Sequence, residues 1–177
     1  MQYESAATSA REAVSPGSVF ISYSREDLNR VERIVKVLTD ADLHVWWDRD
    51  IEVGAAFRSA IQASLDEAAC VVVFWSLSSV DSQFVCSEAS QGQEKGILRP
   101  VLLDANARIP VGFTELQHLD LTRWDGTTEQ LRPLVEPIRR LVARGPSKNA
   151  YVPTLFKNNW AVNNSQQIVA ELSRLTT

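Results

Sequence analysis

CVVVFW, residues 70–75, is a continuous apolar run that no polar side chain interrupts. A strand buried on both faces of a parallel sheet has this pattern, whereas a strand with one solvated face alternates between apolar and polar residues. The run therefore predicts the central strand of a parallel sheet. Upstream of it, VFIS at residues 19–22 is a short β-branched and aromatic run that predicts a first strand.

Apolar stripes with helical spacing lie between the predicted strands. The stripes are Leu28, Val31, Val35 and Leu38, then Phe57, Ile61, Leu65 and Ala68. The charged residues of the first stripe's segment, which should form a solvated face, are Arg25, Glu26, Arg30, Arg33 and Lys36. Further strands are predicted at 44–47, 97–103 and 117–122, a loop at 48–54, a serine-rich loop at 76–82 and a helix at 84–94.

Prolines complicate the last two elements of this pattern. Pro100 lacks the N–H that a strand in the sheet would donate, which weakens the strand predicted at 97–103. A last helix is predicted from about residue 131, and the spacing Thr127-x-x-Gln130 indicates a capping box before it. Pro133 and Pro137 predict that this helix starts late or is kinked.

Strands that alternate with helices imply right-handed crossovers. The predicted fold class is α/β, a flavodoxin-like open five-stranded parallel sheet with helices on both faces. Residues 1–17 are predicted to be a flexible leader and 18–143 the domain. Gly145-Pro146-Ser147 marks a break, so 144–177 is predicted to be a linker with one short helix.

Composition excludes several classes of function. The 177 residues are 45% hydrophobic and 23% charged, which suits one globular domain. A net charge of -4 argues against nucleic acid or anionic lipid as a partner. No apolar run approaches the roughly 20 residues that cross a membrane, and the N-terminal stretch lacks a secretory pattern, so a cytoplasmic location is expected. Two cysteines and two histidines support neither a disulfide scaffold nor a metal site.

Sheets of this class bind ligands at the carboxyl ends of the strands, where the strand order reverses between the first and third strands. The sequence has no aspartate at the end of residues 70–75, which excludes a phosphoacceptor, and it has no GxGxxG or GxxxxGK[ST] motif. Phe84 and Glu88 are four residues apart on one predicted helix, so an aromatic ring and a carboxylate share a face near this point. An exposed surface glutamate is the alternative interpretation of Glu88.

Four segments in order resemble the successive boxes of a TIR (Toll/interleukin-1 receptor) domain. They are VFISYSREDLNRVERIVKVL, VWWDRDIEVG, VVVFWSLSSVDSQFVCSE and ILRPVLLD, within residues 18–143. The resemblance implies an NAD+ glycohydrolase in which Glu88 is catalytic, because enzymatic members place a glutamate at the end of a W-V-x-x-E-like pattern. Here Phe84 replaces the tryptophan, which keeps a stacking face but loses the indole donor.

The resemblance also implies a substrate-binding surface. Its residues would be Tyr23, Ser24, Arg25, Asp48, Glu52, Ser78, Ser79 and Phe84. Other roles stay open for some of them, because Arg25 is also explained as surface charge, and Asp48, Ser78 and Ser79 as turn residues. NAD+ would be a substrate rather than a cofactor, and no metal is implied.

From the family, we expect nicotinamide and ADP-ribose or a cyclic ADP-ribose isomer as products. We also expect self-association through TIR–TIR contacts, with a role as a defence or virulence effector. A non-enzymatic signalling module that works through TIR–TIR assembly is the alternative.

Overall fold

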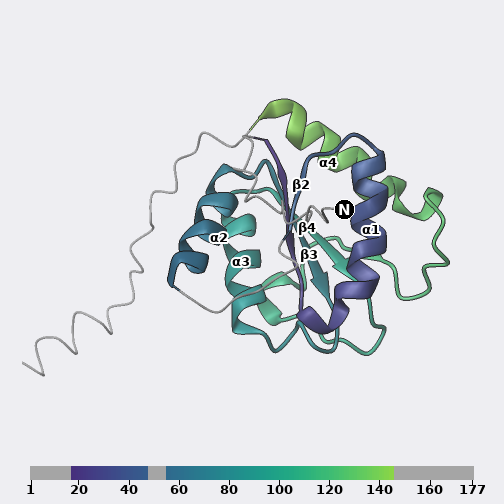
Figure 1. Ribbon diagram of the computed structural model, residues 1–177. Coiled ribbons are helices and arrows are strands. Elements are labelled where there is room, and N and C mark those ends of the chain that lie inside the picture. The colour runs from purple at the N-terminus through teal and green to yellow at the C-terminus, as the bar shows by residue number, and fades with distance from the viewer. Residues whose placement is uncertain (1–16, 48–54, 146–177) are drawn as a thin grey trace, which may run out of the picture. The chain divides into compact units, whose positions relative to one another are not determined.

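Residues 17–47 and 55–145 are described by the computed structural model, the side chains of 55–59 excepted, and they contain a five-stranded sheet of order β2-β1-β3-β4-β5 (Figure 1). Every neighbouring pair of strands is parallel. The strands are β1 (Val19–Ser22), β2 (Val45–Trp46), β3 (Cys70–Trp75), β4 (Leu98–Leu102) and β5 (Leu119–Asp120). This arrangement confirms the flavodoxin-like fold predicted from the sequence.

Strand β3 is the centre of the sheet, as its unbroken apolar run predicts. All six of its residues are buried. It pairs with β1 from Val19↔Cys70 to Ser22↔Val73, and with β4 from Val71↔Leu98 to Trp75↔Leu102. Strand β3 therefore joins the two halves of the sheet, and its carboxyl end lies next to that of β1.

Helices cover both faces of the sheet (Figure 1). The α-helices are α1 (Leu28–Asp40), α2 (Ala55–Glu67), α3 (Gln83–Glu94) and α4 (Arg132–Arg144), and short 3-10 turns η1 (Arg25–Asp27), η2 (Val111–Phe113) and η3 (Glu129–Leu131) lie between elements. Helices α2 and α3 lie on one face, and α1 and α4 on the other. Right-handed crossovers require this division, because the chain moves from β1 to β2 in one direction and from β2 through β4 in the other.

The edge strands are shorter than predicted. Strands β2 and β5 span Val45–Trp46 and Leu119–Asp120, inside the segments 44–47 and 117–122 predicted as strands. Each of these strands has a single neighbour, so its apolar pattern is weaker and fewer of its residues are held in the ladder.

Pro100 lies inside β4 at no cost to the ladder. Ile97 and Leu103, which flank this strand, hydrogen-bond to the backbone of β3, whereas the Leu102 carbonyl accepts a hydrogen bond from the Leu121 N–H just after β5. By alternation, the nitrogen of Pro100 faces the β5 side. The first pair between β4 and β5 joins Val101 to Leu119. No β5 residue lies opposite Pro100, so no carbonyl there lacks a donor.

The last helix begins within one residue of the predicted position and contains Pro137, but the predicted capping box is wrong. Helix α4 begins at Arg132 and Pro133 lies in its first turn, where a missing N–H costs nothing. The N–H of Thr127 instead donates to Asp125 Oδ1 at 2.9 Å. Thr127 therefore belongs to a turn upstream of the helix.

No helix among residues 17–47 and 55–145 is long and apolar enough to cross a membrane. The predicted leader at 1–17 falls outside the described residues except for Gly17, and the loop at 48–54 and nearly all of the tail at 144–177 also fall outside them. The proposed domain boundaries stay predictions.

Candidate active site at the carboxyl end of the sheet

The strand order reverses between β1 and β3, so this is the point at which a ligand site is predicted. Ser22 is the last residue of β1, and its side chain shares a face with Phe20 because strand side chains alternate. That face is the one beneath α3. A Cβ at Gly92 of α3 would meet Val71, which pairs with Phe20 in the sheet.

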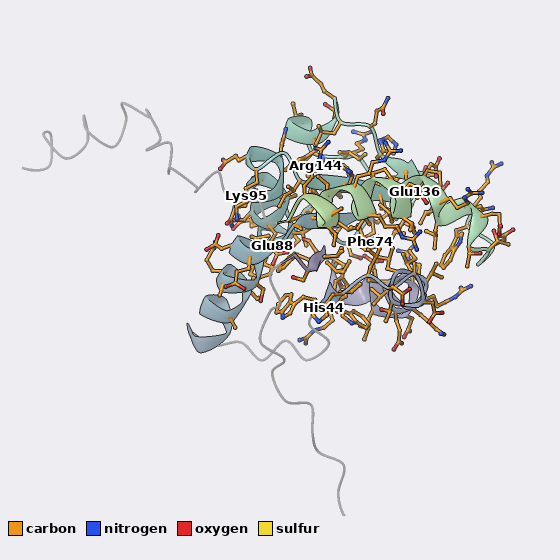
Figure 2. All side chains as sticks on the ribbon, turned by 90° about the horizontal axis from the view of Figure 1, so that it is seen from above. His44, Phe74, Glu88, Lys95, Glu136 and Arg144 are labelled. Atoms are coloured by element: carbon orange, nitrogen blue, oxygen red, sulfur yellow. The ribbon has the colours of Figure 1, made fainter. Side chains whose placement is uncertain are left out.

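Glu88 lies in the second turn of α3, and only 6% of its surface is exposed. The helix begins after Ser82, whose hydroxyl accepts a hydrogen bond from the Val85 N–H at 3.4 Å. Figure 2 shows Glu88 on the α2 and α3 side of the sheet, whereas Phe74 lies on the side of α1 and α4. The alternative interpretation of Glu88 as an exposed surface residue is therefore wrong.

The carboxyl group of Glu88 has an unusual proton affinity. Burial raises the pKa of Glu88 to about 8 from an ordinary value of 4.5, and the nearby Ser22 hydroxyl opposes this rise. Within the described part of the chain, no cation forms an ion pair with Glu88. A buried carboxyl with no counter-ion is held mostly neutral at pH 7, and a positive charge placed beside it would ionise it.

Ser22 is the residue of this site that the sequence analysis missed. Its hydroxyl oxygen is buried and has no hydrogen-bond partner of ordinary distance and angle among the described residues. It nevertheless lies near enough to Glu88 to lower the pKa of that carboxyl. The contact in the structure is therefore looser than a regular hydrogen bond. Side chains of VFIS point alternately to the two faces of the sheet. This alternation and the position of Glu88 on its helix are the signal that could have predicted that Ser22 lies near Glu88.

Aromatic rings surround the ends of β1 and β2. The Trp46 and Phe20 rings stack with centroids 5.0 Å apart, on the same face as Ser22. Tyr23 and Trp47 pack at a tilt, with centroids 6.1 Å apart. Phe84 lies one turn before Glu88 on α3 and is 44% exposed, so its ring is accessible to a ligand.

The two residues Ser24 and Arg25 after β1 differ in their exposure and contacts. Ser24 Oγ donates a hydrogen bond to the Glu26 carboxylate, which holds the pKa of Glu26 below its ordinary value. Arg25 is exposed and opens the 3-10 turn η1, ahead of the helix α1. Both the ligand-contact role and the surface role of Arg25 are compatible with this position.

The two serines predicted after β3 differ in their exposure. Ser79 is buried, and its Oγ donates to the Phe74 carbonyl at 2.7 Å and accepts from the Ser76 N–H at 2.8 Å. This geometry fits the turn role of Ser79 rather than ligand contact. Ser78 is exposed, and its N–H donates to Ser76 Oγ at 3.2 Å. Asp48 and Glu52 lie outside the described residues.

A polar network that the sequence did not reveal ties the loops of this edge together. Arg30, predicted to be solvated, pairs with buried Asp27 and with Asp104 Oδ1 at 2.7 Å. Ser76 Oγ donates to Asp27. Arg33 lies over the Trp124 ring, 5.0 Å from its centroid. Arg30 and Arg33 are exposed, as the predicted solvated face requires, and each also makes a contact that the sequence did not predict.

Within the described ranges, no group of three or more histidine, cysteine, aspartate or glutamate side chains is arranged to hold a metal ion. The described residues bring a buried carboxyl, a buried hydroxyl and an exposed aromatic ring to this edge.

Comparisons with known proteins give a family and a fold. The sequence profile of the TIR domain matches residues 19–135. The TIR domain of the Toll-related receptor TRR-2 from Hydra magnipapillata superposes with a TM-score of 0.58 at 22% identity, covering 68% of this chain and 97% of that one. The TIR domains of the activated Roq1 resistosome, which recognises the pathogen effector XopQ, give a TM-score of 0.43 at 19% identity, covering 88% and 98%. No curated protein matches the chain.

Proposed function

Because this chain belongs to the TIR domain family, we propose that it is an NAD+ glycohydrolase in which Glu88 is the catalytic residue. The reaction releases nicotinamide and gives ADP-ribose or a cyclic isomer of it. NAD+ is the substrate, and the reaction as proposed uses no further cofactor.

The observation that carries the proposal is the environment of Glu88. Its carboxyl is buried beneath α3 at the point where the strand order reverses, and no cation of the described residues neutralises it. A buried ionisable group without a partner destabilises a fold, and such groups are concentrated at functional sites. The nicotinamide ring of NAD+ is a cation, so a substrate seated here would supply the charge that the carboxyl lacks.

The chemistry requires only one carboxyl group. The bond between the ribose anomeric carbon and the nicotinamide nitrogen breaks, and its electron pair stays on nitrogen. Nicotinamide therefore leaves as a neutral molecule, and no general acid is needed, in contrast to the hydrolysis of sugars. The ribosyl group is left as an oxocarbenium-like cation, which the Glu88 carboxylate stabilises. A water oxygen then bonds to the anomeric carbon and its proton passes to Glu88, or an adenine nitrogen attacks and closes the ring.

The remaining proposed contacts are those of substrate binding. Phe84 offers an exposed ring for stacking, and Arg25 an exposed cation for the phosphates. The proposed substrate-binding residues also include Tyr23 and Ser24 in the loop after β1 and Ser78 in the loop after β3. Asp48 and Glu52 stay in the proposal through the family resemblance.

The test is incubation of the full chain with NAD+ and chromatographic measurement of nicotinamide release. Glu88→Gln should reduce the rate by at least about 100-fold, because the neutral amide cannot stabilise the ribosyl cation. Glu94→Gln is the matched control, since Glu94 lies on the same helix and is exposed. Equal rates for a folded Glu88→Gln variant and the Glu94→Gln variant would refute the proposal.

Assembly through TIR–TIR contacts is the second candidate function, and exposed apolar residues favour it. Leu77 and Phe84, 58% and 44% exposed, both lie between the end of β3 and the first turn of α3. Exposed apolar side chains mark a protein contact where they form a continuous patch, which is what the assembly candidate requires of these two residues. Light scattering at increasing protein concentration tests this candidate. Association that weakens in Leu77→Ser while no NAD+ is consumed would support an interaction module over an enzyme.

A further inference from the structure

Ser22 and Ser18 are both buried serines of the first strand segment with an unpaired hydroxyl. Ser22 is 1% exposed, and the oxygens of both side chains lack a hydrogen-bond partner among the described residues. An unsatisfied buried hydroxyl destabilises a protein relative to an apolar side chain of the same size. What distinguishes Ser22 is its position at the carboxyl end of β1, because that is where Glu88 lies.

The geometry brings the Ser22 hydroxyl and the Glu88 carboxyl together. Ser22 pairs in register with Val73 and faces the α3 side, as Phe20 and Val71 do. Glu88 is buried on the face of α3 that packs on this part of the sheet. Burial raises the pKa of the Glu88 carboxyl, and the Ser22 hydroxyl lowers it.

Other charged and titratable groups around α3 lie elsewhere. Asp66 of α2 pairs with Lys95 just after the end of α3, and the guanidinium of Arg99 on β4 acts on the Cys70 thiol. Strand β1 has no ionisable side chain and β3 has only Cys70, which faces the α1 and α4 side by alternation. Helix α2 also carries Glu67, and α3 itself carries Cys86, on which Asp81 acts, and the exposed Glu94. The side chain of Arg58 on α2 lies outside the described residues. Two buried polar atoms without a hydrogen-bond partner among the described residues lie at this end of the α3 side, the Ser22 hydroxyl and the Trp75 Nε1, and the Ser22 hydroxyl is the one that acts on the Glu88 carboxyl.

We propose that Ser22 is a positioning residue, whose hydroxyl donates a hydrogen bond to the Glu88 carboxylate once that group is ionised. In the ligand-free protein the carboxyl is mostly neutral and the contact is loose. When a cation ionises Glu88, one carboxylate oxygen accepts a hydrogen bond from the Ser22 hydroxyl and the other oxygen stays free. The catalytic use of this contact rests on the proposed function, in which the free oxygen faces the ribosyl cation.

The experiment follows the Glu88 carboxyl directly, without NAD+. The full chain is labelled with carbon-13 at the glutamate carboxyl carbons, and the Glu88 signal is identified by its absence in Glu88→Gln. Its titration is measured by NMR in the wild type, Ser22→Ala, Ser22→Thr and Ser18→Ala. Ser18 is the matched control, because it is buried, unpaired and on the same face, but lies about 13 Å away along the strand segment.

Ser22→Ala should move the Glu88 titration upward by about 1 pH unit, since the ionised form loses its donor. Ser22→Thr, which keeps the hydroxyl, and Ser18→Ala should titrate like the wild type. Identical titrations in Ser22→Ala and Ser18→Ala would overturn the proposal. If Ser22→Ala does not fold, Ser22→Gly removes the same hydroxyl and carries the same test.

A second measurement separates this proposal from the proposed function. The pH at which kcat/KM for NAD+ reaches half its maximum should rise in Ser22→Ala and not in Ser18→Ala, which a merely structural role would not produce. A moved Glu88 titration with no NAD+ cleavage by any variant supports the Ser22 contact and refutes the glycohydrolase.

Discussion

Arg30 Nη1 lies 2.7 Å from Asp104 Oδ1, an ion pair that joins the first turn of α1 to the loop after β4. The same guanidinium pairs with buried Asp27, which accepts a hydrogen bond from Ser76 after β3. Asp104 also accepts from the Leu77 N–H at 3.0 Å. Three loops at the carboxyl edge of the sheet are therefore held in fixed positions around the candidate site.

Loss of Asp27 should destabilise the domain strongly. Asp27→Ala leaves Arg30 and Ser76 without their buried partner, and we expect the free energy of unfolding to fall by roughly 2–4 kcal/mol. Asp40→Ala is the control, because Asp40 pairs with Lys36 on the exposed surface, where such pairs contribute at most about 1 kcal/mol. Urea denaturation measures both variants. Similar losses in the two would show that the network does not hold the loops.

Glu88 should make stability depend on pH in a stated direction. Below about pH 4.5 the group is protonated in both folded and unfolded chains. Between there and its folded pKa of about 8 the unfolded chain releases the proton while the folded chain keeps it, so stability falls as pH rises. Glu88→Gln should remove this slope and be more stable than the wild type at pH 8 by roughly 1–3 kcal/mol. Unfolding curves from pH 4 to 9 provide the measurement, and parallel curves for the two proteins would contradict it.

Phe84 should act on substrate binding rather than on folding, if the glycohydrolase proposal holds. Its ring is exposed, so Phe84→Ala should change the unfolding free energy by less than about 1 kcal/mol while raising KM for NAD+ about tenfold through lost stacking. Phe84→Trp should lower KM about 2–5-fold because the indole has a larger face. Leu77→Ala, another exposed apolar residue, should leave KM unchanged. If Leu77→Ala and Phe84→Ala have the same effect, stacking on Phe84 is not involved.

The central part of the fold could be predicted from the sequence because its signals are local. The apolar run of β3 and the stripe of α1 follow directly from residue spacing. The bounds of the edge strands could not be predicted, because they depend on how far each neighbour extends. The pairing of Arg30 with Asp104, 74 residues away, depends on the closed fold.

The candidate site could be predicted only where its signals are local in the sequence. Helical spacing links Phe84 and Glu88, but it does not say which of them is buried. The position of α3 over β1 decides this, and it leaves Phe84 exposed and Glu88 covered. Ser22 becomes visible as a neighbour of Glu88 only once β1 and α3 are placed together.

Gly92 should be sensitive to the smallest substitution. A Cβ at this position would lie 2.9 Å from Val71 Cβ and 3.2 Å from Leu98 Cδ1, so Gly92→Ala would push α3 away from the strands. The overpacking costs about 1–3 kcal/mol and exceeds the gain of up to about 1 kcal/mol in helix propensity. Gly112→Ala is the control, since a Cβ there meets nothing within 4 Å. Thermal unfolding should separate the two variants, and a Gly92→Ala protein as stable as Gly112→Ala would contradict the close contact.

The rate of NAD+ cleavage should follow the ionisation of Glu88. In the free protein the pKa of about 8 leaves few molecules with a carboxylate at pH 6, so kcat/KM should fall about tenfold for each pH unit below 7 and level off above pH 8. Bound NAD+ favours the ionised form, so kcat at saturating substrate should stay high to lower pH than kcat/KM does. Initial rates from pH 5 to 9 test both curves, with Glu94→Gln as the control. The ionisation of Glu88 lowers stability over the same pH range, so this group gives no gain in folding that could raise the rate. A flat kcat/KM profile would mean that Glu88 does not titrate in the reaction.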